Sequence, residues 1–344
     1  MAQFLSMNYR LLGKTGIRVS ELCLGTMTFG NEADRTTSFR IMDRFSDDGG
    51  NFVDTADIYN KGKSEEILGE WLKTRNREDF IIATKVRFRS GNGPNGIGLT
   101  RKHILHSIEK SLERLGTDYV DLLQVHAWDP LTPLEETMSA LNSLVQNGKV
   151  RYIGASNFRG WQLALSLGIS RSRGYAEFVS IQPQYSLLCR STEFELIPLS
   201  MHENLSVLPW SPLKGGLLSG KYSRDAGNMP EDSRIGRMLN RGGSQVFGIN
   251  EEYTWKVINS LKEVAGAINR TPSQVALNWL LNREGVTSPI IGARNIAQLE
   301  DNLASTGWTL NKSDMDYLGS ASKFFVTYPY DEESDNQQKD GRIP

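Results

Sequence analysis

The sequence predicts a single (β/α)8 barrel, in which eight parallel strands alternate with eight helices. Strand-sized apolar segments alternate with helical patterns along most of the 344 residues, and there are eight segments of each kind. Several strand candidates are nearly continuous apolar runs, which is typical of parallel strands covered on both faces. An open doubly wound sheet is the alternative, but it usually has fewer strands and a Gly-rich first turn. No G-x-G-x-x-G follows the first strand here, which favours the barrel.

The expected strands are 21–26, 51–57, 80–86, 119–126, 151–156, 178–184, 206–211 and 288–293. The helical patterns between them cover 36–48, 64–75, 101–115, 134–147, 160–168, 192–203, 251–268 and 295–304. In the segment 101–115, apolar residues recur at helical spacing and form one stripe. Thr100 stands at the N-cap position of this helix, and Gly116 stands where the helix should end.

Three further segments fall outside the repeat. Residues 7–20 predict a hairpin with a Lys-Thr-Gly turn, placed to cap the bottom of the barrel. The stretch 222–250 is rich in Gly, Arg, Asn and Ser and forms a long connection of the kind that is usually functional or mobile. An extra C-terminal helix precedes the polar tail 331–344, which we expect to be disordered. With no domain linker visible, residues 1–330 are expected to form one domain.

Composition narrows the classes of function. The 39 basic and 40 acidic side chains nearly cancel, and no basic stripe stands out, which argues against nucleic acid or an anionic membrane as a partner. The longest apolar runs are too short to cross a bilayer, and the N-terminus lacks the layout of a signal peptide. Cys23 and Cys189 are the only cysteines and show no metal-ligand spacing, so we expect no metal site and a cytoplasmic location.

Polar residues stand at the ends of successive expected strands, where barrel enzymes carry their chemistry. Asp54 and Asp57 close the second strand, with Tyr59 just beyond, while Lys85 and His126 end the third and fourth. Each alone has a structural explanation: a Lys at a strand end usually extends its charge to solvent, and an Asp can cap a turn. Their occurrence at successive strand ends of one barrel favours a shared function.

Together these side chains would form a proton-transfer group. A Tyr with its ordinary pKa of about 10 is a poor general acid near neutrality, and a nearby ammonium such as that of Lys85 lowers this pKa. A buried Lys85 needs a counter-ion to stay charged, and Asp54 can serve. His126 can hydrogen-bond a substrate oxygen. Such a group suits protonation of an alkoxide as a hydride arrives at carbon.

Several motifs resemble, in order, the signature segments of the aldo-keto reductases. They are NFVDTADIYNKGKSEEILGEWL, IIATKV, YVDLLQVH, RYIGASNF, IQPQYSLL, PWSPLKGGLLSGKY and IIGARNIAQLEDN, and the similarity runs from about residue 8 to 320. The resemblance implies NADP(H)-dependent reduction of an aldehyde or ketone. It also implies that Asp54, Tyr59, Lys85 and His126 are the catalytic group, with Tyr59 as the proton donor and nicotinamide C4 as the source of hydride.

The same resemblance implies an extended NADP(H) across the barrel top. Gly25, Thr26, Met27 and Asp54 would lie near the nicotinamide ribose, Ser156, Asn157 and Gln182 would bond the carboxamide, and Trp210 would stack on the ring, where many members have Tyr. The pyrophosphate loop would comprise Ser211, Pro212, Leu213, Gly215, Gly216 and Lys221, with Arg234 folding over it.

The adenosine end would be held by Gly292, Arg294, Gln298, Asp301 and Asn302, with Arg294 on the 2′-phosphate. Much of the family has Lys-Ser where this sequence has Gly292 and Ala293, a departure that bears on the choice between NADP and NAD.

The substrate pocket is expected to be apolar and aromatic, formed by Phe29, Tyr59, His126 and Trp128 and suited to a hydrophobic or sugar-like carbonyl. The loop 87–99, the segment 222–250 and the aromatic residues at 324–330 are further candidates to line it.

The resemblance also admits a second function, that of an NADP-binding regulatory subunit similar to the potassium-channel β subunits. A third alternative is an inactive scaffold, but burying the charge of Lys85 without a purpose would be costly. The sequence shows no coiled coil or basic N-terminal extension that would suggest a membrane partner. The family includes monomers, dimers and octamers, so a homo-oligomer is compatible with the resemblance.

Overall fold

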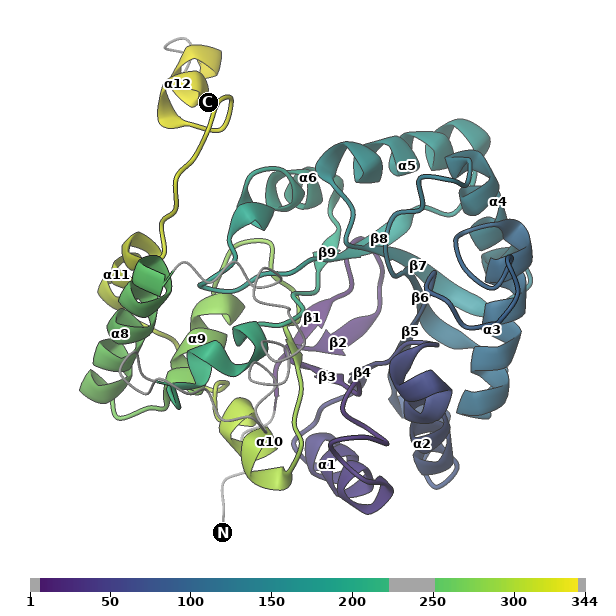
Figure 1. Cartoon of the computed structure of the whole chain (residues 1–344), viewed down its shortest axis with the longest axis horizontal. Coiled ribbons are helices and arrows are strands. Elements are labelled where there is room, and N and C mark those ends of the chain that lie inside the picture. The colour runs from purple at the N-terminus through teal and green to yellow at the C-terminus, as the bar shows by residue number, and fades with distance from the viewer. Residues whose placement is uncertain (1–6, 223–250, 340–344) are drawn as a thin grey trace.

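The chain forms a barrel of eight parallel strands surrounded by helices, seen in a computed structural model that describes residues 7–222 and 251–339 (Figure 1). The strand order is β10-β3-β4-β5-β6-β7-β8-β9. Their bounds are β3 Cys23–Gly25, β4 Phe52–Asp54, β5 Ile81–Val86, β6 Val120–Val125, β7 Val150–Ser156, β8 Phe178–Gln182, β9 Ser206–Val207 and β10 Ile290–Ile291. The segments flanking β9 and β10 close the ring, because the Thr287 N–H donates to Val207 O at 2.9 Å and the Ile290 N–H to Pro209 O at 2.8 Å. The predicted (β/α)8 architecture is confirmed.

Helices cover the outside of the barrel. They are α1 Arg35–Asp47, α2 Lys63–Leu72, α3 Arg101–Leu115, α4 Leu134–Gln146, α5 Gly160–Arg173, α6 Leu196–Glu203, α8 Glu251–Ala267, α9 Pro272–Leu281, α10 Ile296–Leu303 and α11 Lys312–Ala321. Short 3-10 turns occur at Arg77–Asp79 and Ser191–Glu193 and, beside the barrel mouth, at Tyr59–Gly62 and Lys214–Ser219. Helix α3 begins and ends as predicted: the Thr100 side chain accepts from the His103 N–H, and Gly116 adopts a left-handed φ of 62°. The large hydrophobic core lies between these helices and the outer face of the sheet.

The N-terminal hairpin closes the bottom of the barrel, as the sequence predicts. Strands β1 (Tyr9–Leu11) and β2 (Arg18–Ser20) pair antiparallel, and Leu12 after β1 and Val19 within β2 are fully buried in one cluster with residues of the barrel interior. The Gly13 N–H donates to Ser206 Oγ at 2.6 Å, which ties the hairpin to β9. Since this end is filled, the barrel opens only toward the C-terminal ends of its strands, where Tyr59, Lys85 and His126 stand.

The structure differs from the predictions mainly in its C-terminal third. Helix α9 is absent from the predicted elements, while α11 matches the extra C-terminal helix. The tail expected to be disordered over 331–344 contains a further helix, α12 (Glu332–Lys339), which projects away from the barrel in Figure 1. Because its sequence is polar throughout, it lacks the apolar period by which helices are predicted. Nearly all of the long connection at 222–250, with Arg234, lies outside the described residues.

No helix in 7–222 or 251–339 has both the length and the apolar character needed to cross a membrane.

Candidate active site

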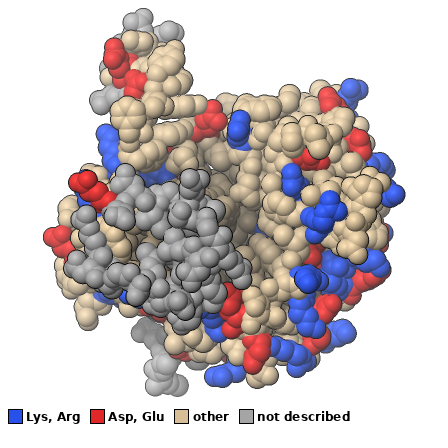
Figure 2. Space-filling model, in the orientation of Figure 1, with Lys and Arg blue, Asp and Glu red and all other residues tan. Residues whose placement is uncertain are grey.

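A cavity of about 600 Å³ opens at the C-terminal ends of the strands. Its size lies within the range of small-molecule and cofactor sites. Part of the hollow is visible near the centre of the face in Figure 2, beside the undescribed atoms. Most of the predicted site residues line it: Gly25, Met27, Asp54, Tyr59, His126, Ser156, Asn157, Gln182, Trp210, Ser211, Pro212, Leu213, Gly215, Gly216, Lys221, Gly292, Arg294, Gln298, Asp301 and Asn302.

Lys85 lies at the centre of the predicted catalytic group. Its side chain is completely buried, and its ammonium donates to Asp54 Oδ1, to the Thr55 carbonyl oxygen at 2.6 Å and to Tyr59 Oη at 3.3 Å. Burial alone would lower the pKa of Lys85, but the charges of Asp54 and Tyr59 outweigh burial and hold that pKa above its ordinary value. The ammonium therefore stays protonated beside the Tyr59 phenol.

Asp54 is held from both sides. While Oδ1 accepts from Lys85, Oδ2 accepts from Gln124 Nε2 at 3.1 Å and from Gln182 Nε2 at 2.9 Å. These donors come from β5, β6 and β8, so three strands fix one carboxylate. A buried charge with donors on both oxygens can remain ionised, and Asp54 can serve as the counter-ion that the sequence predicts.

His126 stands on the other side of Tyr59. Its ring makes edge-on contacts with Tyr59, at a centroid distance of 5.8 Å, and with Phe88, at 4.8 Å. Burial, followed by the charges of Lys85 and Arg87, lowers the pKa of His126 to about 2. Its Nδ1 is buried without a hydrogen-bond partner among the described residues. The ring is therefore a neutral imidazole, able to donate one hydrogen bond to an oxygen in the cavity.

The predicted nicotinamide end is organised by Asn157. This residue adopts a left-handed φ of 56°, and its amide nitrogen donates to the His126 carbonyl at 2.9 Å. Its amide oxygen accepts from Trp210 Nε1 at 3.0 Å, and Ser156 Oγ donates to the Gln182 carbonyl at 2.8 Å. Asn157 thus links the Trp210 ring to the strand end that carries His126. The expected contacts of Asn157 with a carboxamide stay a prediction.

The cavity walls next to this end contain residues in the left-handed backbone conformation and a glycine at a close strand contact. Ser211, Gly215 and Gly216 have φ values of 55°, 65° and 97° in the loop after β9. A Cβ on Gly25 would come within 2.7 Å of Ile290 Cγ2, so only glycine lets β3 and β10 approach here. Small side chains and left-handed backbone leave room for a ligand to approach the main chain here, and the expected diphosphate contact stays a prediction.

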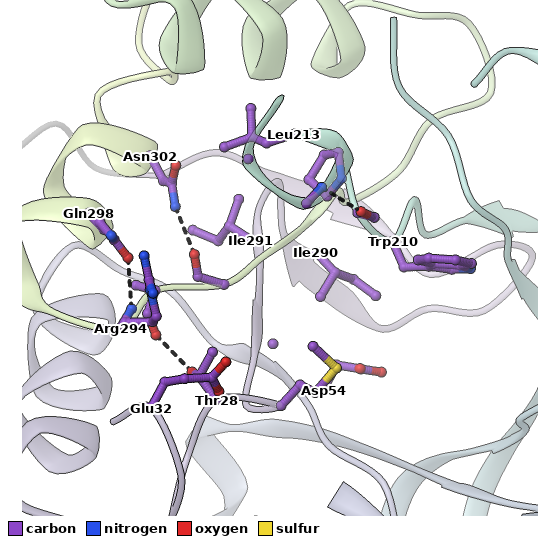
Figure 3. Close-up of a pocket in the computed structure, with 18 of the residues that line it drawn as sticks. Thr28, Glu32, Asp54, Trp210, Leu213, Ile290, Ile291, Arg294, Gln298 and Asn302 are labelled. Atoms are coloured by element: carbon purple, nitrogen blue, oxygen red, sulfur yellow. Dashed lines mark hydrogen bonds between the residues drawn. The ribbon is translucent and has the colours of Figure 1, made fainter. Parts of the chain in front are cut away.

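The far end of the cavity lies at the start of α10, where Figure 3 shows Thr28, Glu32, Arg294, Gln298 and Asn302 around one recess. Gln298 Oε1 accepts from the Arg294 N–H at 3.0 Å, and Asn302 Nδ2 donates to the Gly292 carbonyl at 3.2 Å. The Thr28 hydroxyl donates to the Ala293 carbonyl at 2.8 Å, which joins the β3 loop to this wall. A guanidinium beside amide side chains is a donor set suited to a phosphorylated ribose.

Some predicted residues lie elsewhere. Thr26 is fully buried behind the wall, its hydroxyl 2.6 Å from Ser64 Oγ. Phe29 turns into the hydrophobic core, and Trp128 packs edge-on against Phe158 and Trp161, so neither lines the cavity. The tail aromatics are also absent from its walls: Phe324 and Tyr330 pack against Phe194, and Phe325 and Tyr328 are exposed.

The prediction also missed part of the lining, namely Thr28, Glu32, Ile58, Ser219, Ser273, Ile290 and Ile291. Phe88, directly after β5, does line the cavity, and it belongs to the loop 87–99 that the sequence predicts as candidate lining. Ile290 and Ile291 lie within an expected strand, but their apolar side chains gave no sign of facing a site. Glu32 lies in a loop after the first strand and had no pattern to distinguish it.

A family model described as the aldo/keto reductase family matches residues 21–323. The chain therefore belongs to the aldo/keto reductase family. It is 38% identical over 316 residues to an uncharacterized oxidoreductase, YrpG, of Bacillus subtilis, an alignment that covers 89% of this chain and 93% of that protein.

Two other relatives have names that state different functions. Norsolorinic acid reductase of Aspergillus flavus is 33% identical, with 93% of this chain and 82% of the relative covered. A probable voltage-gated potassium channel subunit beta of Oryza sativa is 35% identical, with 86% and 90% covered. Family and relatives together support an oxidoreductase of small-molecule carbonyl compounds.

Proposed function

We propose that this protein catalyses the NADP(H)-dependent reduction of an aldehyde or ketone to an alcohol, by reversible hydride transfer with Tyr59 as proton donor and acceptor. The observation that carries the proposal is the position of Lys85, whose buried ammonium joins Asp54 to Tyr59 Oη at 3.3 Å. This group stands at one end of a cavity whose other end presents Arg294. The group suited to proton transfer and the residues suited to a nucleotide thus line one cavity.

The residues divide the proton chemistry between them. The Lys85 ammonium favours the phenolate over the phenol, which makes Tyr59 a stronger acid than a free Tyr. The neutral His126 ring would donate a hydrogen bond to the substrate oxygen and hold it near Tyr59 Oη. Asp54 keeps Lys85 charged throughout, since both its oxygens are already occupied by donors. When bound, the reduced nicotinamide supplies the hydride.

The described residues fit NADP(H) along the whole cavity. Trp210 and Gln182 would hold the nicotinamide, the left-handed loop at Gly215 and Gly216 would follow the diphosphate, and Arg294 would pair with the 2′-phosphate. We favour NADP over NAD because a guanidinium lines the recess expected for the ribose phosphate. The Glu32 carboxylate in the same recess would repel a phosphate and so oppose that preference. The ratio of NADPH to NADH affinity measures which effect is larger.

A cytoplasmic location belongs to this proposal. Cys23 and Cys189 are both free, as expected of a protein from a reducing compartment.

A regulatory, cofactor-binding subunit is the second candidate. It is favoured by the similarity to probable potassium channel β subunits, at 35% identity over 301 residues for the Oryza sativa protein. The catalytic group does not separate the two functions, because proteins of both kinds resemble this chain over most of its length.

Partner-free kinetics distinguishes the two functions. We would measure oxidation of NADPH, with NADH alongside, by the purified protein against a panel of aldehydes and ketones, and determine NADPH binding separately. Turnover in the absence of any partner supports the enzyme. Tight NADPH binding without turnover, together with stoichiometric capture of a channel protein, would support the regulatory subunit.

A further inference from the structure

Asp57 is a buried acid next to the catalytic group to which the proposed mechanism gives no role. Its side chain is 4% exposed, and both carboxylate oxygens lack a hydrogen-bond partner of ordinary geometry among the described residues. Its backbone N–H donates to the Lys85 carbonyl oxygen at 3.3 Å, so Asp57 is attached directly to the strand residue that activates Tyr59. A buried carboxyl without donors is costly when ionised and therefore calls for an explanation.

The charges around Asp57 come from three elements. Glu65 of α2 is fully buried, accepting from the Thr84 hydroxyl at 2.5 Å and from Arg114 Nε of α3 at 2.7 Å. Arg114 is therefore engaged by Glu65 and does not pair with Asp57. The third charge is Lys85 of β5, which already donates to three acceptors. Lys85 bonds Asp54 and Tyr59, which lie on either side of Asp57 in the sequence.

These surroundings set when Asp57 is charged. Burial, followed by the Glu65 carboxylate, raises the pKa of Asp57 to about 7, against the opposing effects of Arg114, the Ile58 N–H and Lys85. Asp57 is thus neutral in mildly acidic solution and ionised in mildly basic solution.

We propose that Asp57 is a positioning residue that acts through Lys85, its buried carboxyl gaining or losing a proton and thereby adjusting the acidity of Tyr59. A neutral Asp57 leaves the Lys85 ammonium balanced by Asp54 alone, and the ammonium then favours the Tyr59 phenolate most strongly. An ionised Asp57 adds a second negative charge near Lys85, which disfavours the phenolate and weakens Tyr59 as an acid. The proton moves between Asp57 and solvent, and no bond to substrate is involved.

The inference rests on the proposed function of Tyr59, but it also predicts a property that needs no turnover. In Asp57→Asn the Tyr59 phenol should lose its proton at a pH lower by roughly half to one unit, because a nearby negative charge has been removed. The absorbance change of tyrosinate, taken as the difference between each protein and its Tyr59→Phe counterpart, isolates this residue from the other tyrosines. An unchanged Tyr59 titration in Asp57→Asn overturns the proposal.

The second readout is the pH profile of carbonyl reduction. The native rate should fall roughly threefold as pH rises through about 7, while Asp57→Asn stays flat over that interval. Glu65→Gln should move the fall to lower pH, since the Glu65 charge helps to keep Asp57 protonated. A near-neutral fall of native size that persists in Asp57→Asn would also overturn the proposal.

Asp121→Asn is the matched control. Asp121 is also a buried aspartate, but it lies near the start of β6 at the closed end of the barrel, bonded to Arg77 and the Ile82 N–H. Its replacement should alter stability without changing either pH readout, and a shift of the same size in this control would count against the assignment. If no carbonyl is turned over but the Tyr59 titration moves as expected, the proposed function fails while the coupling of Asp57 to Tyr59 stands.

Discussion

Replacing Lys85 by Met would measure how much of the acidity of Tyr59 depends on one buried ammonium. Lys85 Nζ and Tyr59 Oη are 3.3 Å apart. For unit charges at this distance, Coulomb's law with an effective dielectric constant of about 20 gives an attraction of about 5 kcal/mol between the ammonium and the phenolate. If roughly half of this is expressed when the proton is half transferred, the chemical step slows by about 10²-fold. Binding of NADPH should change little, since Lys85 is not among the residues lining the cavity.

The assay is single-turnover oxidation of bound NADPH, so that slow product release does not hide the chemical step. Lys85→Met also leaves Asp54 without its counter-ion, which should destabilise the fold by roughly 3–5 kcal/mol. The double variant Asp54→Asn with Lys85→Met separates these effects, because stability should recover while turnover stays low. A chemical step within threefold of native in folded Lys85→Met would refute the reasoning.

Three further predictions concern cofactor choice and stability. Arg294→Ala should weaken NADPH binding by about 10–100-fold and NADH far less; equal weakening in a fluorescence titration would remove Arg294 from the 2′-phosphate. The pKa of His126 is lowered to about 2 in the folded state, so only the unfolded chain binds the extra proton below about pH 6.5, and stability is lost as pH falls. In urea unfolding, His126→Asn should therefore lose less stability than the native protein between pH 7 and 5. Parallel losses in the two proteins would contradict this. Gly69→Ala should destabilise the fold by roughly 2 kcal/mol or more, because the added Cβ would lie 2.3 Å from the Arg114 carbonyl oxygen. Gly168→Ala meets open space and should stabilise the fold by about 0.5–1 kcal/mol. Thermal unfolding compares the two variants, and similar shifts in both would contradict the packing argument.

Local signals predicted the barrel and much of the site. Alternation of strands and helices is set by apolar periodicity, and Thr100 and Gly116 marked the ends of α3 because capping depends on a few neighbouring atoms. Lys85 and His126 were found because parallel strands in a barrel bring their C-terminal ends to one face.

The remaining features depend on contacts that a linear pattern does not contain. Phe29 was expected in the substrate pocket, yet the turn that follows β3 directs it into the core, and composition alone does not distinguish the two positions. Glu32 lines the cavity only because its loop, which follows β3, lies beside Arg294 near the start of α10 (Figure 3). Arg114, the cation beside Asp57, is bonded to Glu65, a pairing 49 residues apart in sequence that no local pattern reveals.

The central claim is that Tyr59 is the proton donor of an NADP(H)-dependent carbonyl reductase. The most direct test is NADPH oxidation by native protein and by Tyr59→Phe, with NADPH binding measured in both. The account predicts native turnover on at least one aldehyde or ketone, and in Tyr59→Phe binding within about twofold of native with turnover reduced by at least about 10²-fold. Turnover in Tyr59→Phe close to the native rate would contradict it.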